Sequence, residues 1–219
     1  AFDKYLGTPE LWQEAENSLR EIADEKGVDY FEAPGEAAFY GPKMDFMTKD
    51  SIGREWQVAT IQLDINMPER FDLFCINEEG EQERIVMVHA AIMGSIERFM
   101  SIFIEHHAGA FPLWLAPTQV RILPVSDKFL DYASEVKKRL EESDVRVEID
   151  DSNEGLGKKI RNAEMEKVPY MLVVGEKEVE SKQVAVRNYQ TKKQNVMDLD
   201  AFVEGLLKEI QGRELETQL

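Results

Sequence analysis

Hydrophobic residues follow two rhythms along this chain, one typical of helices and one typical of strands. From Leu11 to Ile22 the apolar positions recur at helical spacing, between the capping residue Thr8 and the helix-ending Gly27. This pattern predicts an amphipathic helix over residues 9–26. Beyond it, short apolar or alternating runs are separated by Gly, Pro and acidic turns, which is typical of strands. Such runs occupy residues 30–31, 39–40, 44–47, 56–63, 71–76 and 84–89, with a hairpin turn at 51–54 and a helix over 91–104.

The rhythm changes after an extended, Pro-punctuated connector at residues 111–118. Strands separated by helices now indicate βαβ units and at least partly parallel pairing. The strands are predicted at 120–125, 145–149, 170–175 and 183–187, and the helices at 128–141, 155–167 and 199–210. We therefore expect an α+β domain over residues 1–117, with an antiparallel sheet and helices, followed by an α/β domain over 118–219 with a mixed, mostly parallel sheet.

The distribution of charge supports the same division. The formal net charge of the 219 residues is −17. Residues 1–117 carry 9 basic against 22 acidic side chains, whereas residues 118–195 carry 15 of each. Because binding to nucleic-acid phosphates needs local Lys and Arg, only the second region has the composition for such a partner.

Composition and motifs exclude several classes of protein. With 43% hydrophobic and 32% charged residues, the chain is typical of soluble globular proteins. It contains neither an apolar run near the ~20 residues of a spanning helix nor a signal or transit peptide, so we expect a cytoplasmic protein without a membrane partner. The single cysteine, Cys75, excludes an internal disulfide and a Cys-clustered zinc site. No metalloprotease helix, Walker loop or nucleophile elbow occurs, so a protein nucleophile is not supported.

Polar side chains interrupt the apolar run at residues 56–63. In a regular strand Gln57 and Gln62 would lie on opposite faces, whereas Thr60 and Gln62 would share one. Buried polar groups need hydrogen bonds, either with each other or with a ligand, and the pattern leaves both open. By spacing alone, Lys43 is most simply a solvated surface charge, and a lone His89 is more often packed than bound to metal.

Several segments of the chain resemble the threonyl-tRNA synthetase family in their order and spacing. The sequence Gly-Ser-Ile-Glu-Arg-Phe at residues 94–99 is similar to class II motif 3. His89 lies nine residues before Arg98, which distinguishes threonyl from prolyl, glycyl and histidyl relatives. The resemblance runs from about residue 5 to about residue 212. Its other segments are residues 41–43, 56–64, 68–71, 86–89 and 109–117 in the first half, and residues 153–154, 168–171, 175–181 and 184–187, which resemble the family's anticodon-binding domain.

The resemblance implies a reaction and a set of site residues. The family uses ATP to join threonine to tRNA(Thr), with release of AMP and pyrophosphate. It implies Zn²⁺, and ATP with Mg²⁺, as cofactors, and a homodimeric parent enzyme. By position, it assigns catalysis to Arg98, Lys43 and Gln62, ATP and adenylate binding to Gln57, Thr60, Ser95 and Arg98, threonine binding to Tyr40 and Gln62, one of three zinc ligands to His89, and anticodon reading to Asn153, Glu178 and Arg187.

These implied roles make physical sense. A Lewis acid that grips the threonine hydroxyl can reject valine, which a hydrophobic pocket discriminates poorly. The planar, permanently charged guanidinium of Arg98 suits a place over adenine and phosphates. Single-stranded loops are recognised mostly by base edges and stacking, so a region of zero net charge, such as residues 118–195, can read them. We expect the Arg187 guanidinium to be largely exposed, with little effect on folding when it is replaced.

Parts of the family pattern have no counterpart in this sequence. Motif 1, the motif 2 loop, the Cys and His that complete the zinc site and the editing domains are absent. Ala90 stands where the family usually has Arg, and Ala59 where many members have Gly, which indicates an altered variant or a divergent member. We therefore expect a C-terminal fragment that is inactive by itself, does not retain zinc and keeps the anticodon-binding domain. A stand-alone, non-catalytic protein that binds tRNA or a synthetase, or a regulatory module that reuses the fold, is the alternative.

Overall fold

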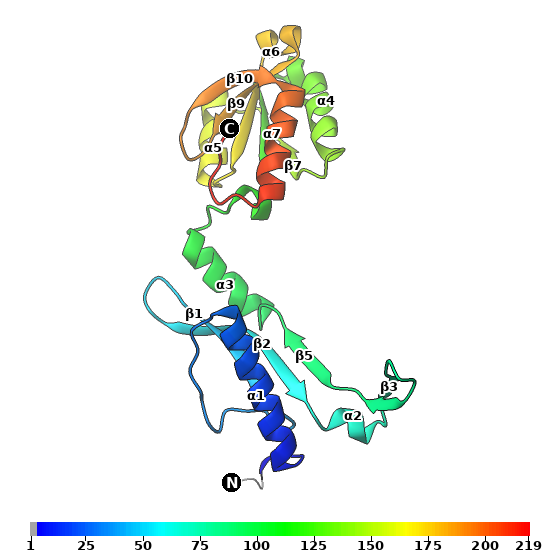
Figure 1. Ribbon diagram of the computed structural model, residues 1–219. Helices are drawn as coiled ribbons and strands as arrows, with labels where there is room; N and C mark the ends of the chain where they lie inside the picture. The colour runs from blue at the N-terminus through cyan, green and yellow to red at the C-terminus, as the bar shows by residue number, and fades with distance from the viewer. Residues whose placement is uncertain (1–3) are drawn as a thin grey trace. The chain divides into compact units, whose positions relative to one another are not determined.

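The computed structural model describes residues 4–219 and divides into two compact units, Ala1–Phe103 and Ile104–Leu219 (Figure 1). The division falls within helix α3 (Ile96–His107), ahead of the domain boundary predicted after residue 117, which stays a prediction. Within residues 4–219, no helix is long and apolar enough to cross a membrane. Each unit is described by itself.

The first unit contains helix α1 and an antiparallel sheet in the order β1-β2-β5, while β3 and β4 pair separately. The helix predicted over residues 9–26 is confirmed, because the Thr8 hydroxyl accepts the Leu11 N–H and Gly27, at φ 62°, ends the helix. The elements are α1 (Pro9–Lys26), β1 (Lys43–Lys49), β2 (Glu55–Asp64), α2 (Met67–Arg70), β3 (Phe74–Ile76), β4 (Gln82–Arg84), β5 (Met87–Ala91) and α3.

The predicted helix over residues 91–104 is wrong at its start. Met93 and Gly94 have φ angles of 67° and 62°, which an α-helix cannot contain. The helix therefore begins only at Ile96, and the residues before the bend form β5. Met93 is not a glycine, so its left-handed backbone marks a locally constrained turn.

Two of the strand predictions in the first unit are also wrong. Residues 30–31 form no strand, and residues 39–40 lie within an isolated bridge between Ala38 and Gly41. The strand predicted at 71–76 shortens to Phe74–Ile76, because Asp72 takes a left-handed φ of 49° after helix α2.

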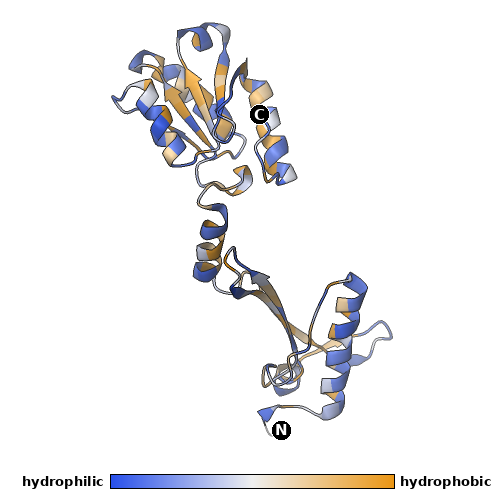
Figure 2. Ribbon diagram, turned by 90° about the vertical axis from the view of Figure 1, so that its left-hand side faces the viewer, coloured by the Kyte–Doolittle hydropathy of each residue, from blue (hydrophilic) through white to orange (hydrophobic). Residues whose placement is uncertain are grey.

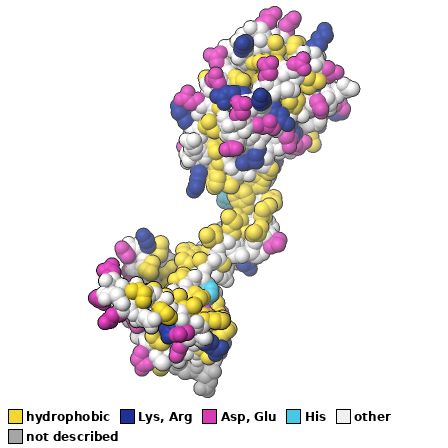
Figure 3. Space-filling view, turned by 90° about the vertical axis from the view of Figure 1, so that its right-hand side faces the viewer, with side chains coloured by type: hydrophobic (Ala, Val, Ile, Leu, Met, Phe, Trp, Pro, Cys, Tyr) yellow, Lys and Arg dark blue, Asp and Glu magenta, His cyan; other side chains and the backbone are white. Residues whose placement is uncertain are grey.

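Few hydrophobic side chains are buried in the first unit. Among its described residues, the buried hydrophobic side chains are Trp12, Ala15 and Ala23, all from α1. Among the residues that the structure describes, nineteen large hydrophobic side chains of this unit are exposed, against six in the second unit. Figure 3 shows hydrophobic side chains, in yellow, at its surface. Exposed apolar surface of this extent is typical of a face that binds other protein.

The second unit is built on a mixed sheet in the order β10-β9-β8-β6-β7. The predicted mixed α/β sheet is confirmed. Parallel pairing links β6 to β7 and β8, whereas β9 is antiparallel to β8 and β10, so the parallel share is smaller than predicted. The elements are the short helical turns η2 (Leu113–Leu115) and η3 (Asp127–Phe129), β6 (Val120–Pro124), α4 (Leu130–Glu141), β7 (Val147–Ile149), α5 (Leu156–Met165), β8 (Tyr170–Val174), α6 (Glu176–Ser181), β9 (Gln183–Asn188), β10 (Gln194–Asp198) and α7 (Leu199–Gly212).

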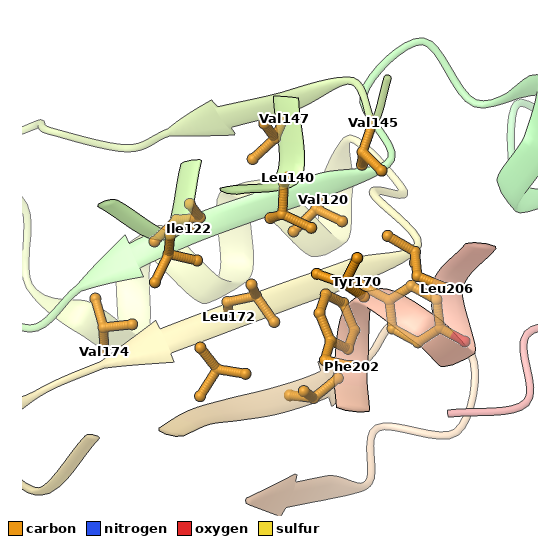
Figure 4. Close-up of a cluster of buried hydrophobic side chains, with 14 of the residues drawn as sticks. Val120, Ile122, Leu140, Val145, Val147, Tyr170, Leu172, Val174, Phe202 and Leu206 are labelled. Carbon is orange, nitrogen blue, oxygen red and sulfur yellow. The ribbon is translucent and has the colours of Figure 1, made fainter. Parts of the chain in front are cut away.

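Helices cover both faces of this sheet, and its middle strand β8 is hydrophobic throughout (Figure 2). On one face, Ile122 and Leu172 pack with Phe202 and Leu206 of α7 and with side chains of α4 (Figure 4). On the other face, the alternate residues of the same strands pack against α5. The second unit therefore has two hydrophobic clusters of its own.

We expect Leu206→Ala to lower the free energy of unfolding of the second unit by about 2–5 kcal/mol, because it leaves a cavity in a fully buried cluster. The matched control is Leu215→Ala, at a side chain that is 71% exposed, which should change it by less than about 0.5 kcal/mol. Urea titration followed by circular dichroism measures both. Equal losses would contradict this description of the core.

Candidate functional site

One face of the β1-β2-β5 sheet carries a row of polar side chains. Lys43, Gln62 and His89 are register partners across the three strands, and Asp45 and Thr60 are partners one step further along. Because every second residue of a strand points to the same side, all five share one face of the sheet. The structure thus brings together residues that are far apart in the sequence.

A β-bulge brings Gln57 to the same face. The register between β1 and β2 shifts after Phe46, so that Met47 lies opposite Gln57. The Gln57 Nε2 then donates to Asp45 Oδ1 at 2.9 Å. The expectation that Gln57 and Gln62 lie on opposite faces is wrong, because it assumed a strand without a bulge.

Asp45 holds two of the predicted site residues in place. One of its carboxylate oxygens accepts from the Lys43 ammonium and the other from the Gln57 amide. The Lys43 side chain is only 20% exposed, so the interpretation of Lys43 as a solvated surface charge is wrong. Sequence reasoning did not single out Asp45, although its alternation with Lys43 along one strand places it on this face.

Tyr40 and Thr60 add two hydroxyl groups to this face. The Tyr40 hydroxyl donates to Gln62 Oε1, and the Tyr40 ring meets the His89 ring edge-on at 5.6 Å. Among the described residues, the buried Thr60 hydroxyl has no hydrogen-bond partner. An unpaired buried hydroxyl costs about 1–3 kcal/mol, so Thr60 is a point of local instability in this face.

Asp64 fixes the ring of His89. Its side chain is almost fully buried, and its Oδ2 lies 3.0 Å from His89 Nε2. Burial raises the pKa of Asp64, but hydrogen bonds from the Met67 N–H, the His89 ring and the Asn66 N–H outweigh burial and lower that pKa. A carboxylate that orients a histidine ring in this way is the usual outer partner of a metal ligand. Sequence reasoning missed this role of Asp64.

The described residues do not make a zinc site by themselves. A catalytic zinc site takes three protein ligands, and the polar row offers one imidazole. Within residues 4–219, no three His, Cys, Asp or Glu side chains lie together so that they could hold a metal. The role of His89 as a zinc ligand stays a prediction. A zinc ion bound there would need its other protein ligands from outside residues 4–219.

The motif 3 segment lies beside the bulge. The Ser95 hydroxyl accepts the Arg98 N–H at 3.5 Å at the start of α3, and it also donates to Glu97. A Cβ atom on Gly94 would lie 3.2 Å from Arg98 Nη2 and 3.5 Å from the Gln57 carbonyl oxygen. Arg98 is therefore next to the polar row, and its guanidinium has no hydrogen-bond or ion-pair partner in the described part of the chain.

The two alanines that depart from the family pattern lie away from the polar row. Ala90 is the register partner of Ile61, and Ala59 is the partner of Phe46. Both pairs alternate with the polar residues, so they belong to the opposite face of the sheet. Neither alanine therefore lies on the polar side of these strands.

In the second unit, Asn153 and Glu178 follow the carboxyl ends of β7 and β8, two strands that flank β6. Asn153 is exposed in a bend. Glu178 Oε2 accepts the Gly175 N–H at 3.0 Å and so caps helix α6. The edge at which parallel strands end is a common position for binding loops.

Arg187 lies near the other end of the same sheet. It is the register partner of Met171, at the start of β8, roughly 13 Å along the strand from the Glu178 end. Its Nε and Nη2 donate to Glu164 Oε1 at 3.2 and 2.9 Å, and its Nη1 donates to the Lys192 carbonyl at 3.1 Å. The side chain is 22% exposed, so the expectation of a largely exposed guanidinium is wrong.

A shallow depression borders Arg187. Its lining combines two cations, an aromatic ring and polar groups, which suits stacking and hydrogen bonding to a base. Arg187 has five N–H donors, and three of them are engaged within the described residues, which leaves two for a ligand. The lining residues are Arg161, Glu164, Met165, Tyr189, Gln190 and Lys192.

Comparison with known families assigns both units. Residues 6–107 match the tRNA synthetase class II core domain (G, H, P, S and T), and residues 119–209 match the anticodon binding domain. These two matches place the chain among the class II aminoacyl-tRNA synthetases.

The individual relatives are threonine–tRNA ligases and a threonyl-tRNA synthetase domain. The chain is 54% identical to the threonine–tRNA ligase of Clostridioides difficile (strain 630) and 53% identical to that of Acetivibrio thermocellus, in both cases over 95% of this chain and 33% of the relative. It is similar to the crystal structure of the RNA binding domain of threonyl-tRNA synthetase from Cryptosporidium parvum Iowa II, with a TM-score of 0.85, 38% identity, and 98% of this chain and 54% of that chain covered. This chain belongs to the threonyl-tRNA synthetase family, and it spans about a third of the length of the curated relatives it matches.

The Asp64 carboxylate should make the stability of the first unit depend on acid. Its pKa is lowered from the ordinary 3.8, so its contribution is complete above that value and is lost as the pH falls through the lower, folded pKa. We expect Asp64→Asn to have a lower free energy of unfolding than the unchanged chain near neutral pH. Between about pH 5 and pH 2, that free energy should fall less for Asp64→Asn than for the unchanged chain. The matched control is Asp72→Asn, at a side chain that is 81% exposed. Urea titrations across this pH range measure the effect, and parallel profiles for Asp64→Asn and the unchanged chain would contradict it.

Proposed function

We propose that this chain takes part in joining threonine to tRNA(Thr), with the first unit as one wall of the threonine and ATP site and the second unit as the anticodon-binding domain. The observation that carries the first part is the shared sheet face of Lys43, Gln57, Thr60, Gln62 and His89. Their family roles are those implied by the resemblance. The zinc, the Mg²⁺ and the homodimer of the parent enzyme stay predictions.

The chemistry of activation fits the charges at this face. The threonine carboxylate forms a bond to the α-phosphorus of ATP, and the bond to pyrophosphate breaks, so negative charge gathers on phosphate oxygens. Lys43 and Arg98 are the cations beside the polar row, and the buried Thr60 hydroxyl and the Gln62 amide supply neutral hydrogen-bonding groups. Asp45 holds the Lys43 ammonium in one position, which lowers the reorganisation that binding needs.

A single wall orients a substrate from one side only. Electrostatic stabilisation of a transition state needs groups placed around the reacting atoms in a site that excludes water. The polar row is partly exposed, with His89 at 44%. We therefore propose that the chain alone binds RNA but does not activate threonine.

The isolated chain should show no threonine-dependent exchange of pyrophosphate into ATP and no stoichiometric zinc, because the polar row is a single wall with one imidazole and the described residues hold no cluster of three metal ligands. Radiolabel exchange and metal analysis of the purified chain measure this. The positive control is the full-length ligase of Clostridioides difficile under the same conditions. Robust exchange by this chain would overturn the proposal that it is catalytically incomplete.

Anticodon binding is supported by the positions of the candidate readers. Asn153 and Glu178 lie at one end of the sheet, and Arg187 lies at the other end, where its partners Glu164 and Lys192 line the depression. Bases of a single-stranded loop are read when they are splayed apart, so readers at separate ends can contact different bases. Base contacts of this kind specify sequence, whereas scattered lysines only position the backbone.

We expect Arg187→Ala to weaken binding of a threonine-anticodon stem-loop by about 1–3 kcal/mol, the size of one good base contact. It should also cost about 1–3 kcal/mol of stability, because Glu164 loses its partner in a partly buried pair. Titration at fixed low salt against a stem-loop with a scrambled anticodon measures the first effect, and thermal melting measures the second.

Glu164→Gln is the matched control for this prediction. It weakens the ion pair but keeps an oxygen that can accept from Arg187, so discrimination between the two stem-loops should survive. Equal affinity of the unchanged chain for both loops would show that the second unit does not read the anticodon.

A further inference from the structure

Three polar side chains are buried together at one end of the second unit. Tyr170, Asn188 and Glu209 are 0%, 2% and 4% exposed, and the Tyr170 hydroxyl lies 2.9 and 3.0 Å from the two Glu209 carboxylate oxygens. Burial raises the pKa of Tyr170, and the neighbouring Glu209 raises it further, so the hydroxyl stays protonated. Buried polar groups of this kind need partners, and these three find theirs in the last residues of the chain.

The segment Thr217–Leu219, here named the C-terminal strap, is held mainly through its backbone. Glu209 Oε1 accepts the N–H groups of Gln218 and Leu219 at 2.9 and 3.1 Å. The Leu219 N–H also lies 3.1 Å from the Tyr170 hydroxyl. Asn188 Nδ2 donates to Thr217 Oγ1 at 2.9 Å and to the Leu219 carbonyl oxygen at 3.0 Å.

Helix α7 has a glycine, Gly205, where the strap packs closely against it. A Cβ atom on Gly205 would lie 2.7 Å from Leu219 Cδ2, and the Leu219 side chain packs against the larger hydrophobic cluster. Glycine inside a helix costs about 1 kcal/mol relative to alanine. Its presence at this position therefore fits the close approach of Leu219.

Asn188 joins the strap to the turn between β9 and β10. Its Oδ1 accepts the N–H groups of Gln190 and Thr191 at 2.9 and 3.1 Å, and its backbone carbonyl accepts the Lys192 N–H at 2.9 Å. The Lys192 carbonyl in turn accepts Arg187 Nη1 at 3.1 Å. A continuous series of hydrogen bonds thus runs from the strap, through Asn188 and the turn, to the guanidinium of Arg187.

We propose that the C-terminal strap, acting through Asn188, positions Arg187 for the RNA loop. Asn188 is a positioning residue: it has no need to touch RNA, and it fixes the turn that holds one side of the guanidinium. This inference rests on the proposed reading of the anticodon by Arg187. Discrimination between RNA loops by Arg187 then depends on the C-terminal strap, which lies about 30 residues further along the chain and is linked to Arg187 by the hydrogen bonds described above.

The test compares the full chain with two variants that release the strap. One ends at Glu216. The other is Asn188→Asp, which keeps an oxygen for the turn and replaces the amide that donates to the strap. The matched control is Asn195→Asp, the same change at an exposed residue of β10. Each protein is titrated with the threonine-anticodon and scrambled stem-loops, melted thermally, and followed by amide hydrogen exchange in the turn at residues 190–192.

Release of the strap should reduce discrimination between the two stem-loops by roughly fivefold to tenfold, at a temperature where melting shows every variant folded. Amides of the turn should exchange faster in both variants, and Asn195→Asp should change neither quantity. Adding Arg187→Ala to either variant should reduce discrimination little further, because the two changes remove the same contact.

Unchanged exchange in the turn, or effects of strap release and Arg187→Ala that add in full, would overturn the inference. A merely structural strap would lower the melting temperature and leave discrimination intact, which also contradicts it. If the truncated chain does not fold, the measurements on Asn188→Asp alone test the inference. A full chain that binds both loops equally would instead refute the proposed function, and the exchange of the turn amides would then still show whether the strap fixes the turn.

Discussion

Side chains alternate between the two faces of a β-strand, and this period of two decides where each unit can bind a ligand. In the first unit, one face of β1, β2 and β5 collects the polar row. In the second unit, both faces of the sheet are covered by helices and buried in hydrophobic clusters. Polar groups of the sheet itself are therefore exposed mainly towards the ends of its strands, which is where the candidate readers Asn153, Glu178 and Arg187 lie.

Acidic residues organise both candidate sites without being the groups that the family pattern highlights. Asp45 holds Lys43 and Gln57, and Asp64 holds His89. Glu164 holds Arg187 in the second unit. Such partners fix the direction of the cation or ring, so the geometry is present before a ligand binds. The strongly negative charge of the chain is thus compatible with sites for anionic ligands, since part of that charge orients the cations.

Much of the fold could be predicted from the sequence, because caps and periodicity are local. The first helix has Thr8 and Gly27 at its ends, and the strand at residues 170–174 is a continuous apolar run. The start of α3 could not be predicted, because the left-handed turn at Met93 interrupts a hydrophobic pattern that is typical of one continuous helix. Helix α6 and strand β10 were missed because both are short, polar and largely exposed.

The candidate site was predictable in its members but not in its geometry. The motifs name Gln57 and Gln62, yet only the bulge places them on one face. Arg187 is named by its position in the family pattern, yet its guanidinium is held by Glu164 and Lys192, which lie outside any motif. Long-range contacts of this kind leave no local signal.

The most direct test of the account is to follow the guanidinium resonances of Arg187 by NMR while a threonine-anticodon stem-loop is added to the full chain. The account predicts that the Arg187 Nε signal shifts and saturates with the cognate loop and not with a scrambled one, while the Arg98 signal does not move. An Arg187 signal that ignores both loops, or that responds equally to both, would contradict the claim that this end of the sheet reads the anticodon.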